Sequence, residues 1–391
     1  MILIRNGTVI SMEGPDIPDG SVLADGGVIK AVGKGITAPA DCEIIDAGGG
    51  YILPGFIDAH THLGTHETGL RWEGNDTNEA TEPLTPHLRA LDGINPMDES
   101  FAASRGGGIT AAAVSPGSAN VIGGYAVAIK TGGSVSVDGL VMRQPLAMKC
   151  ALGENPKSVY GQGKKVSPQT RMASAALFRE AMLKAREYME KKEKAEPDKK
   201  PDYNMRHEAL IPVLKGEIPI HIHAHRADDI HTAIRLAKEF SLKAVLVHCT
   251  EGHLIPESVK ESGFAAMVGP TLTHKSKPEV INKTFATVNI LNSAGVRVCI
   301  TTDHPVTPLQ HLPLCAALAV QAGMDRDEAL KAISIYPAEI MGLSHRIGSL
   351  KEGKDADIVV WDKHPLDATA SVQVTLIDGK IYSFSPKSFT S

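Results

Sequence analysis

Alternating runs of apolar and polar residues occur at both ends of the chain. I-L-I-R-N-G-T-V-I lies at the amino end, and V-T-L-I-D-G-K-I-Y lies near the carboxyl end. Asn6-Gly7, Asp25-Gly26 and Asp378-Gly379 interrupt these runs, and such pairs favour the tight turns of β-hairpins. We therefore expect residues 1–50 and 347–391 to be all-β and to pair into one small β-sandwich domain.

Between these ends, short apolar runs alternate with amphipathic segments. Eight runs are expected to be strands: Tyr51–Ile57, Ile109–Val114, Ala126–Ile129, Leu146–Leu152, Ile218–His223, Ala244–His248, Ala265–Val268 and Val296–Thr301. Helices are expected at Arg171–Lys192, Asp229–Phe240, Pro278–Ala294 and Asp325–Ile335. This alternation predicts an α/β fold in which residues 51–346 form a parallel (β/α)₈ TIM-like barrel.

Composition and charge indicate which binding partners and which cellular compartment to expect. The 391 residues carry a formal net charge of -5, so there is no basic surface to attract nucleic acid. The amino end lacks the charged start and long apolar stretch of a signal peptide, and no apolar run approaches the roughly 20 residues of a membrane span. The five cysteines are scattered and include no C-x-x-C pair, which favours a reduced, cytoplasmic protein. From the charge and the apolar runs, we expect neither nucleic acid nor a membrane to be a partner.

Histidine and aspartate recur at the carboxyl ends of the predicted strands. The first strand ends in D-A-H-T-H, which places His60 and His62 on one face. The sixth ends in V-H-C with His248, and the last in T-T-D-H with Asp303. In a parallel barrel these ends meet at one rim, where functional residues lie. Because imidazole and carboxylate bind zinc and similar cations, we predict a metal site there.

The fifth strand, H-I-H-A-H-R, offers three histidines at once. His221, His223 and His225 alternate along the chain and would all face the same side of the strand. The pattern indicates only that His221 lies deepest and His225 nearest to solvent, so it does not choose among them.

Taken together, these motifs resemble those of a known family. P-G-F-I-D-A-H-T-H, H-A-H, V-H-C, T-T-D-H and the tail G-S-L-K-E-G-K-D-A-D-I-V-V-W-D are similar to the amidohydrolase superfamily, and most closely to its imidazolonepropionase-like and prolidase-like branch. The resemblance implies one or two divalent metal ions per chain, zinc above all, with manganese or iron as alternatives. It implies these ligands: His60, His62, His223, His248 and Asp303.

The resemblance also assigns the neighbouring residues. His223 begins the H-A-H that matches the family's motif on strand five, so His225 would lie near the substrate or behind the ligands. A two-metal site in this family needs a bridging carboxylate. Lys149, once carboxylated, matches one solution and Glu154 matches another, and a site with one metal ion stays open.

The expected chemistry is hydrolysis of a C–N bond. A bound cation makes hydroxide available near neutral pH and polarises a carbonyl, Asp303 would act as general base, and His274 could stabilise the oxyanion. The predicted substrate is a small molecule with a linear or cyclic amide, and homo-oligomerisation stays open. The alternatives are a deaminase of the same superfamily and a non-catalytic relative.

Two features bear on specificity. The long polar segment Thr65–Arg89 has the character of a loop that covers a substrate. Arg71, Arg89 and Arg226 are candidates for binding a substrate carboxylate.

Overall fold

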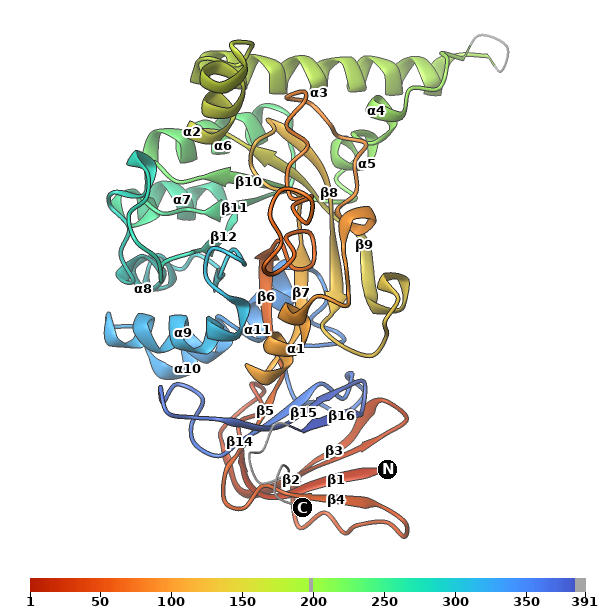
Figure 1. The fold of residues 1–391 in the computed structure, drawn as a ribbon, viewed down its shortest axis with the longest axis vertical. Helices are drawn as coiled ribbons and strands as arrows, with labels where there is room; N and C mark the ends of the chain where they lie inside the picture. The colour runs from red at the N-terminus through yellow and green to blue at the C-terminus, as the bar shows by residue number, and fades with distance from the viewer. Residues whose placement is uncertain (197–199, 384–391) are drawn as a thin grey trace.

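The computed structural model describes residues 1–196 and 200–383, and Figure 1 shows a barrel domain standing on a separate sheet domain. The barrel has eight strands, which are neighbours in chain order. They are β6 (Phe56–Thr61), β7 (Ile109–Val114), β8 (Ile122–Lys130), β9 (Val141–Ala151), β10 (Ile220–Ala224), β11 (Ala244–His248), β12 (Ala265–Val268) and β13 (Val298–Ile300). All eight predicted strands therefore exist.

The barrel is mixed, and this corrects the wholly parallel barrel that we expected. β8 runs antiparallel to both β7 and β9, whereas the other neighbouring pairs are parallel. The physical reason is the connection. A parallel neighbour needs a crossover of a dozen or more residues, usually with a helix, and only residues 115–121 separate β7 from β8.

Helices cover the outside of the barrel. In α6 (Ala227–Glu239), Ile230, Ala233, Ile234 and Ala237 are buried at the spacing of one helical face, and this face packs against the barrel. The other α-helices are α1 (Glu99–Gly106), α2 (Glu154–Pro156), α3 (Arg171–Lys194), α4 (Met205–Glu208), α5 (Ile211–Leu214), α7 (Pro256–Ser262), α8 (Ala286–Ser293), α9 (Leu312–Gln321), α10 (Arg326–Lys331) and α11 (Ile335–Ile340). The predicted helix Pro278–Ala294 is wrong in its first half, because Lys283 donates hydrogen bonds to the carbonyls of Thr273 and His274 and holds a loop there.

Both ends of the chain form the second sheet. Its strands are β1 (Ile2–Val9), β2 (Ile17–Asp25), β3 (Val28–Lys34), β4 (Glu43–Asp46), β5 (Tyr51–Pro54), β14 (Ile358–Trp361), β15 (Val372–Ile377) and β16 (Lys380–Ser383). The order is β16-β15-β14-β5-β1-β2-β3, with β4 also paired to β1. The two ends thus pair as expected, and hydrogen bonds join them into one continuous sheet. Apolar side chains of β1, β2 and β3 pack with those of β14 and β15 in one cluster.

The predicted strand Tyr51–Ile57 is divided between the two sheets. β5 pairs with β1 and β14 of the terminal sheet, and β6 begins the barrel. Gly55 lies between them, where a Cβ atom would stand 2.0 Å from the Thr110 hydroxyl. Only glycine allows the chain to pass so close to β7 at this point.

One end of the barrel is closed by side chains. Ala338 and Met341, in and just after α11, pack with the barrel residues Ile57, Val245 and Met267 in one apolar cluster. Below the barrel, the buried ammonium of Lys130 on β8 contacts Asp355 and Asp357 of the sheet domain at 2.9 and 2.6 Å. The carboxyl ends of the parallel strands, where the predicted ligands lie, are at the opposite mouth of the barrel.

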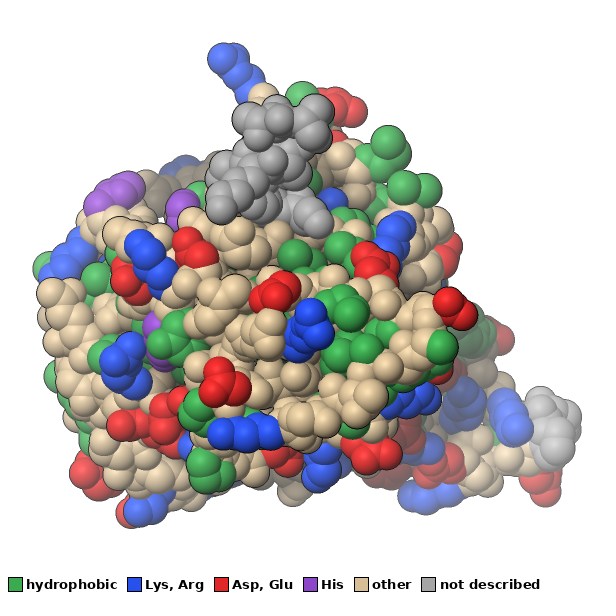
Figure 2. Space-filling model, turned by 90° about the horizontal axis from the view of Figure 1, so that it is seen from below, with side chains coloured by type: hydrophobic (Ala, Val, Ile, Leu, Met, Phe, Trp, Pro, Cys, Tyr) green, Lys and Arg blue, Asp and Glu red, His purple; other side chains and the backbone are tan. Residues whose placement is uncertain are grey.

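Seen from the sheet-domain end, acidic and basic side chains are interspersed over the surface (Figure 2). Within the described residues, no helix combines the length and apolarity needed to cross a membrane.

Candidate metal centre

The H-T-H motif lies where β6 bulges. Between Asp58 and Thr61, β6 has one more residue than its partner β7, and such a bulge re-aims side chains. His60 and His62 each place Nε2 3.3 Å from Oδ1 of Asp303, which follows β13. The structure thus brings together three predicted ligands from opposite ends of the barrel sequence.

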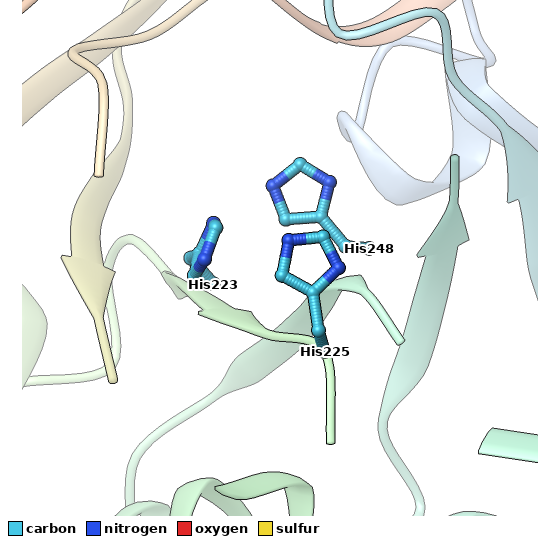
Figure 3. A group of neighbouring side chains, drawn as sticks. All are labelled: His223, His225 and His248. Atoms are coloured by element: carbon cyan, nitrogen blue, oxygen red, sulfur yellow. The ribbon is translucent and has the colours of Figure 1, made fainter. Parts of the chain in front are cut away.

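A second group of donors lies beside the first. Its members, His223 of β10, His225 just after it and His248 at the end of β11, converge (Figure 3), with candidate ligand atoms all within 4.8 Å of one another. The rings of His223 and His225 each lie 4.5 Å from the ring of His248, and the ring centroids of His60 and His248 are 5.3 Å apart. The two groups therefore form one continuous cluster.

Hydrogen bonds orient several of these rings. His62 Nδ1 donates to the carbonyl of Ser115 at 2.8 Å, and His248 Nδ1 donates to the carbonyl of Gly269 at 2.6 Å. His225 Nδ1 pairs with the Thr250 hydroxyl at 2.7 Å. A bond of this kind fixes the tautomer of a metal-binding histidine and leaves Nε2 free for the ion.

The protonation states also suit a cation. Burial lowers the pKa of His248 to about 4, and it holds the pKa of His60, His223 and His225 well below the usual value, so these imidazoles are neutral at pH 7. Burial alone would raise the pKa of Asp303, but neighbouring His248, His60 and His62 outweigh it and keep the carboxyl ionised. Neutral imidazole and carboxylate are the forms that bind metal ions.

Unsatisfied atoms at the site fit a metal ion. Asp303 Oδ1 and both ring nitrogens of His223 are buried without hydrogen-bond partners. At 3.3 Å, the separations from Asp303 to His60 and His62 exceed an ordinary N–H···O bond. They match the edge of about 3.3–3.4 Å that a tetrahedral site has when its bonds are 2.0–2.1 Å.

Backbone strain is concentrated at the same strand ends. His248, Cys249 and Asp303 have φ values of 71°, 44° and 53°, a region that non-glycine residues seldom adopt. Such strain persists only where surrounding structure enforces it, and it clusters at functional sites.

Lys149 and Glu154, the two candidates for a bridging carboxylate, lie in different places. Lys149 is fully buried on β9, and its Nζ is 3.1 Å from His60 Nε2. Burial lowers the pKa of this amine to about 8, although Asp303 acts in the opposite direction. Glu154 instead accepts a hydrogen bond from the backbone of Glu279 and lines a neighbouring cavity with Arg226.

A cleft of about 440 Å³ opens onto both groups of donors. His62, His223, His225 and Asp303 line it, as does the predicted oxyanion residue His274. The remaining lining residues are His66, Asn75, Thr77, Asn78, Gly117, Ser118, Asn155, Pro270, Thr273, Ser276, Lys277, Val280, Lys283, Pro305 and Val306. Four of them come from the predicted covering loop Thr65–Arg89.

The arginines proposed as carboxylate clamps do not reach this cleft. Arg89 is paired with Asp92 and Arg226 with Asp228, and no arginine is among the described residues that line the cleft. Lys277 and Lys283 are its cationic residues instead.

Sequence reasoning missed two buried carboxylates. Asp58, in D-A-H-T-H, is fully buried two residues before His60. Glu279 has 1% exposure and lies 3.5 Å from Nε2 of both His223 and His225. It follows Pro278 in a short 3-10 turn, where no periodic pattern marks a buried position.

A barrel that carries two donor groups at one mouth, with a sheet domain made from both chain ends, defines the amidohydrolase class of proteins. Residues 51–382 match the model described as "Amidohydrolase family", and the chain belongs to this family, which is generally metal-dependent.

Known proteins agree with this assignment. The solved amidohydrolase of Thermotoga maritima MSB8 is 40% identical, with a TM-score of 0.95 over 98% of this chain and 100% of that one. Amidohydrolase tasK of Hapsidospora irregularis is 30% identical over 92% of this chain, which spans only 39% of the length of tasK.

More distant similarities include enzymes of several kinds, dihydroorotases among them. An imidazolonepropionase of Acinetobacter baumannii (strain AB307-0294) is 24% identical over 89% of both chains. A prolidase solved with n-methylphosphonate-l-proline is 18% identical, with a TM-score of 0.62 over 98% of this chain and 100% of that one, and it shows a similar fold alone. The resemblance inferred from the sequence is confirmed.

Proposed function

We propose that this protein is a metal-dependent hydrolase that cleaves the C–N bond of an amide or cyclic amide in a small polar molecule. The observation that carries the proposal is the position of Asp303 Oδ1, 3.3 Å from Nε2 of both His60 and His62 at the edge of the cleft. A divalent cation held there would supply hydroxide near neutral pH and polarise the scissile carbonyl.

Side chains of this protein would carry out the proton transfers. The ionised carboxylate of Asp303 is placed to accept a proton from the attacking water and to return it to the leaving nitrogen. The C–N bond breaks, the carbonyl carbon gains the hydroxyl group and the nitrogen gains the proton. His274 lines the cleft and is proposed to donate to the developing oxyanion, and His225 is close enough to orient the substrate or the ligands.

Lys149 is proposed as the source of a bridging carboxylate, in preference to Glu154. Its amine is buried beside His60, and its lowered pKa makes the uncharged form that reacts with carbon dioxide accessible near pH 8. Glu154 faces the backbone of Glu279 and lines a separate cavity.

The cleft lining supports a polar substrate. Three asparagines, four serines or threonines and five histidines are among its lining residues, and no phenylalanine, tyrosine or tryptophan is among its described residues. The strand-five end reads H-A-H-R and lacks the H-x-x-E that the family resemblance associates with deaminases, which favours the hydrolase.

The test is an assay of the full chain, loaded with zinc or manganese, against dipeptides, N-acyl amino acids and five-membered and six-membered cyclic amides. We expect hydrolysis that is lost on chelation, restored by metal and abolished in Asp303→Asn. Ammonia release from amidine substrates without amide hydrolysis would establish a deaminase instead. Failure to bind metal would overturn the proposal altogether.

A further inference from the structure

Glu279 lies beside Nε2 of His223 and His225 much as Asp303 lies beside Nε2 of His60 and His62. Glu279 Oε1 lies 3.5 Å from Nε2 of both His223 and His225. Like Asp303 Oδ1, it is a buried carboxylate oxygen, and it also contacts Lys277 Nζ at 2.5 Å. Each H-x-H motif therefore faces one carboxylate from a loop: Asp303, after β13, faces His60 and His62, and Glu279, after β12, faces His223 and His225.

These separations suit a shared ion better than hydrogen bonds. An N–H···O bond between imidazole and carboxylate has its heavy atoms at about 2.7–3.2 Å, and 3.5 Å is longer. A tetrahedral site with bonds of 2.0–2.2 Å has ligand atoms about 3.3–3.6 Å apart. Glu279 Oε1 meets this spacing toward both histidines at once.

His248 supplies a fourth donor. Its candidate ligand atom lies within 4.8 Å of those of His223 and His225. The Nδ1 atoms of His248 and His225 are engaged by Gly269 and Thr250, which leaves their Nε2 atoms free. One carboxylate oxygen and three imidazole nitrogens are a complete ligand set for zinc.

The carboxylate of Glu279 is held in place from its other side. Oε2 accepts a hydrogen bond from the backbone amide of Glu154 at 3.1 Å, which turns Oε1 toward the histidines. Lys277 Nζ also contacts Oε1, at 2.5 Å. Because an ionised carboxylate oxygen has two lone pairs, it can accept from Lys277 and still ligate an ion.

We propose that Glu279 is a metal ligand that, with His223, His225 and His248, holds a second ion, in addition to the bridge proposed for Lys149. This inference rests on the metal centre of the proposed function. It adds to the proposed bridged pair a carboxylate that comes directly from an unmodified side chain.

The test is metal binding by the full chain, measured with Co²⁺ by calorimetry and by the absorption bands that report tetrahedral coordination. We expect two equivalents in the wild type. Glu279→Gln should weaken the second equivalent by about 100-fold or more and remove its absorption, while the first stays bound. Lys149→Met removes the proposed bridge and should weaken both equivalents by a similar factor, in contrast to the selective loss in Glu279→Gln, and Glu154→Gln is the matched control that keeps both.

Two further variants distinguish the loss of a metal ligand from a general loss of folding. Glu279→Asp keeps the charge but withdraws the oxygen, so the second equivalent should weaken while the melting temperature changes little. Lys277→Met removes the cation that contacts Oε1, so the second equivalent should bind more tightly.

Three outcomes overturn the inference alone and leave the proposed function in place. They are unchanged Co²⁺ binding in both Glu279 variants, loss of the second equivalent in Lys149→Met alone, and a single wild-type equivalent that survives Glu279→Gln. A single wild-type equivalent lost in Glu279→Gln supports it. A wild type without bound Co²⁺ overturns the inference and the proposed function together, whereas the other failures leave the His60, His62 and Asp303 site intact.

Discussion

Asp58 accepts two hydrogen bonds from Thr302, one from its backbone amide at 2.8 Å and one from its hydroxyl at 2.7 Å. The other carboxylate oxygen accepts from the hydroxyl of Thr301 at 2.6 Å and from the amide of His60 at 3.0 Å. The fully buried Asp58 thereby joins the first and last barrel strands next to the predicted ligands. Burial raises its pKa to about 6, although the hydrogen bonds from Thr301 and Thr302 act in the opposite direction.

Asp58→Asn is expected to lower the free energy of unfolding by about 3 kcal/mol. The new amide NH₂ group is a donor, and it would replace one of the carboxylate oxygens that now accept hydrogen bonds, so buried donors would face a donor. Urea unfolding of the purified variant measures this loss. The exposed Asp202→Asn is the matched control and should change stability by less than about 0.5 kcal/mol. Equal stability of the Asp58 and Asp202 variants would contradict the role assigned to this network.

Gly269→Ala should reduce both stability and metal affinity. Gly269 has a φ of +144°, and an added Cβ atom would lie 1.9 Å from the carbonyl oxygen of Thr301. The backbone must move, and with it the carbonyl that orients His248. We expect a loss of about 1–3 kcal/mol in stability and of about 10–100-fold in metal affinity. Gly33→Ala, where the added carbon meets no atom within 4 Å, is the control. Unchanged affinity in Gly269→Ala would show that this carbonyl does not orient the ligand.

Lys130→Met should destabilise the junction between the two domains. Lys130 and Asp357 have 3% and 4% exposure, so removing the ammonium leaves a buried carboxylate without its main partner. The expected loss is about 3–5 kcal/mol, measured by chemical unfolding. The double variant Lys130→Met/Asp357→Asn should recover part of it, because the unpaired charge is gone. Strictly additive losses would mean that the two side chains are not coupled.

The stability of the metal-free protein should depend on Lys149 at alkaline pH. The folded-state pKa of about 8 lies below the ordinary value of 10.5, so between these values the unfolded chain holds a proton that the folded chain has released. The free energy of unfolding contributed by this residue therefore rises with pH across the window, by about 3 kcal/mol in total. Lys149→Met should lack this rise. Parallel pH profiles for the two proteins would contradict the lowered pKa.

Much of the architecture could be predicted because it depends on local pattern. Apolar runs marked all eight barrel strands, and turn pairs such as Asp378-Gly379 marked the terminal hairpins. The direction of β8 could not be derived from its own residues, since an apolar run has the same appearance in either direction. It depends on the connection before it, which is too short for a parallel crossover.

The candidate site likewise contains residues that the sequence could predict and residues that it could not. That His60, His62, His248 and Asp303 come together could be predicted, because a residue at a strand end keeps its position relative to the strand. Glu279 could not, since it lies in a loop whose path depends on contacts with Lys277 and the backbone of Glu154. The arginines were misjudged for the same reason, because their nearest acidic partners, such as Asp92 for Arg89, are decided by the folded loops.

The sequence by itself therefore determined the barrel strands, the union of the two chain ends and the donors carried on strand ends, because each follows from periodicity within a few residues. Only the tertiary structure decided that β8 runs backwards, that Lys149 and not Glu154 lies against His60, and that Glu279 faces two histidines. These relationships join residues far apart in the chain, and packing and hydrogen bonds across the barrel mouth select them.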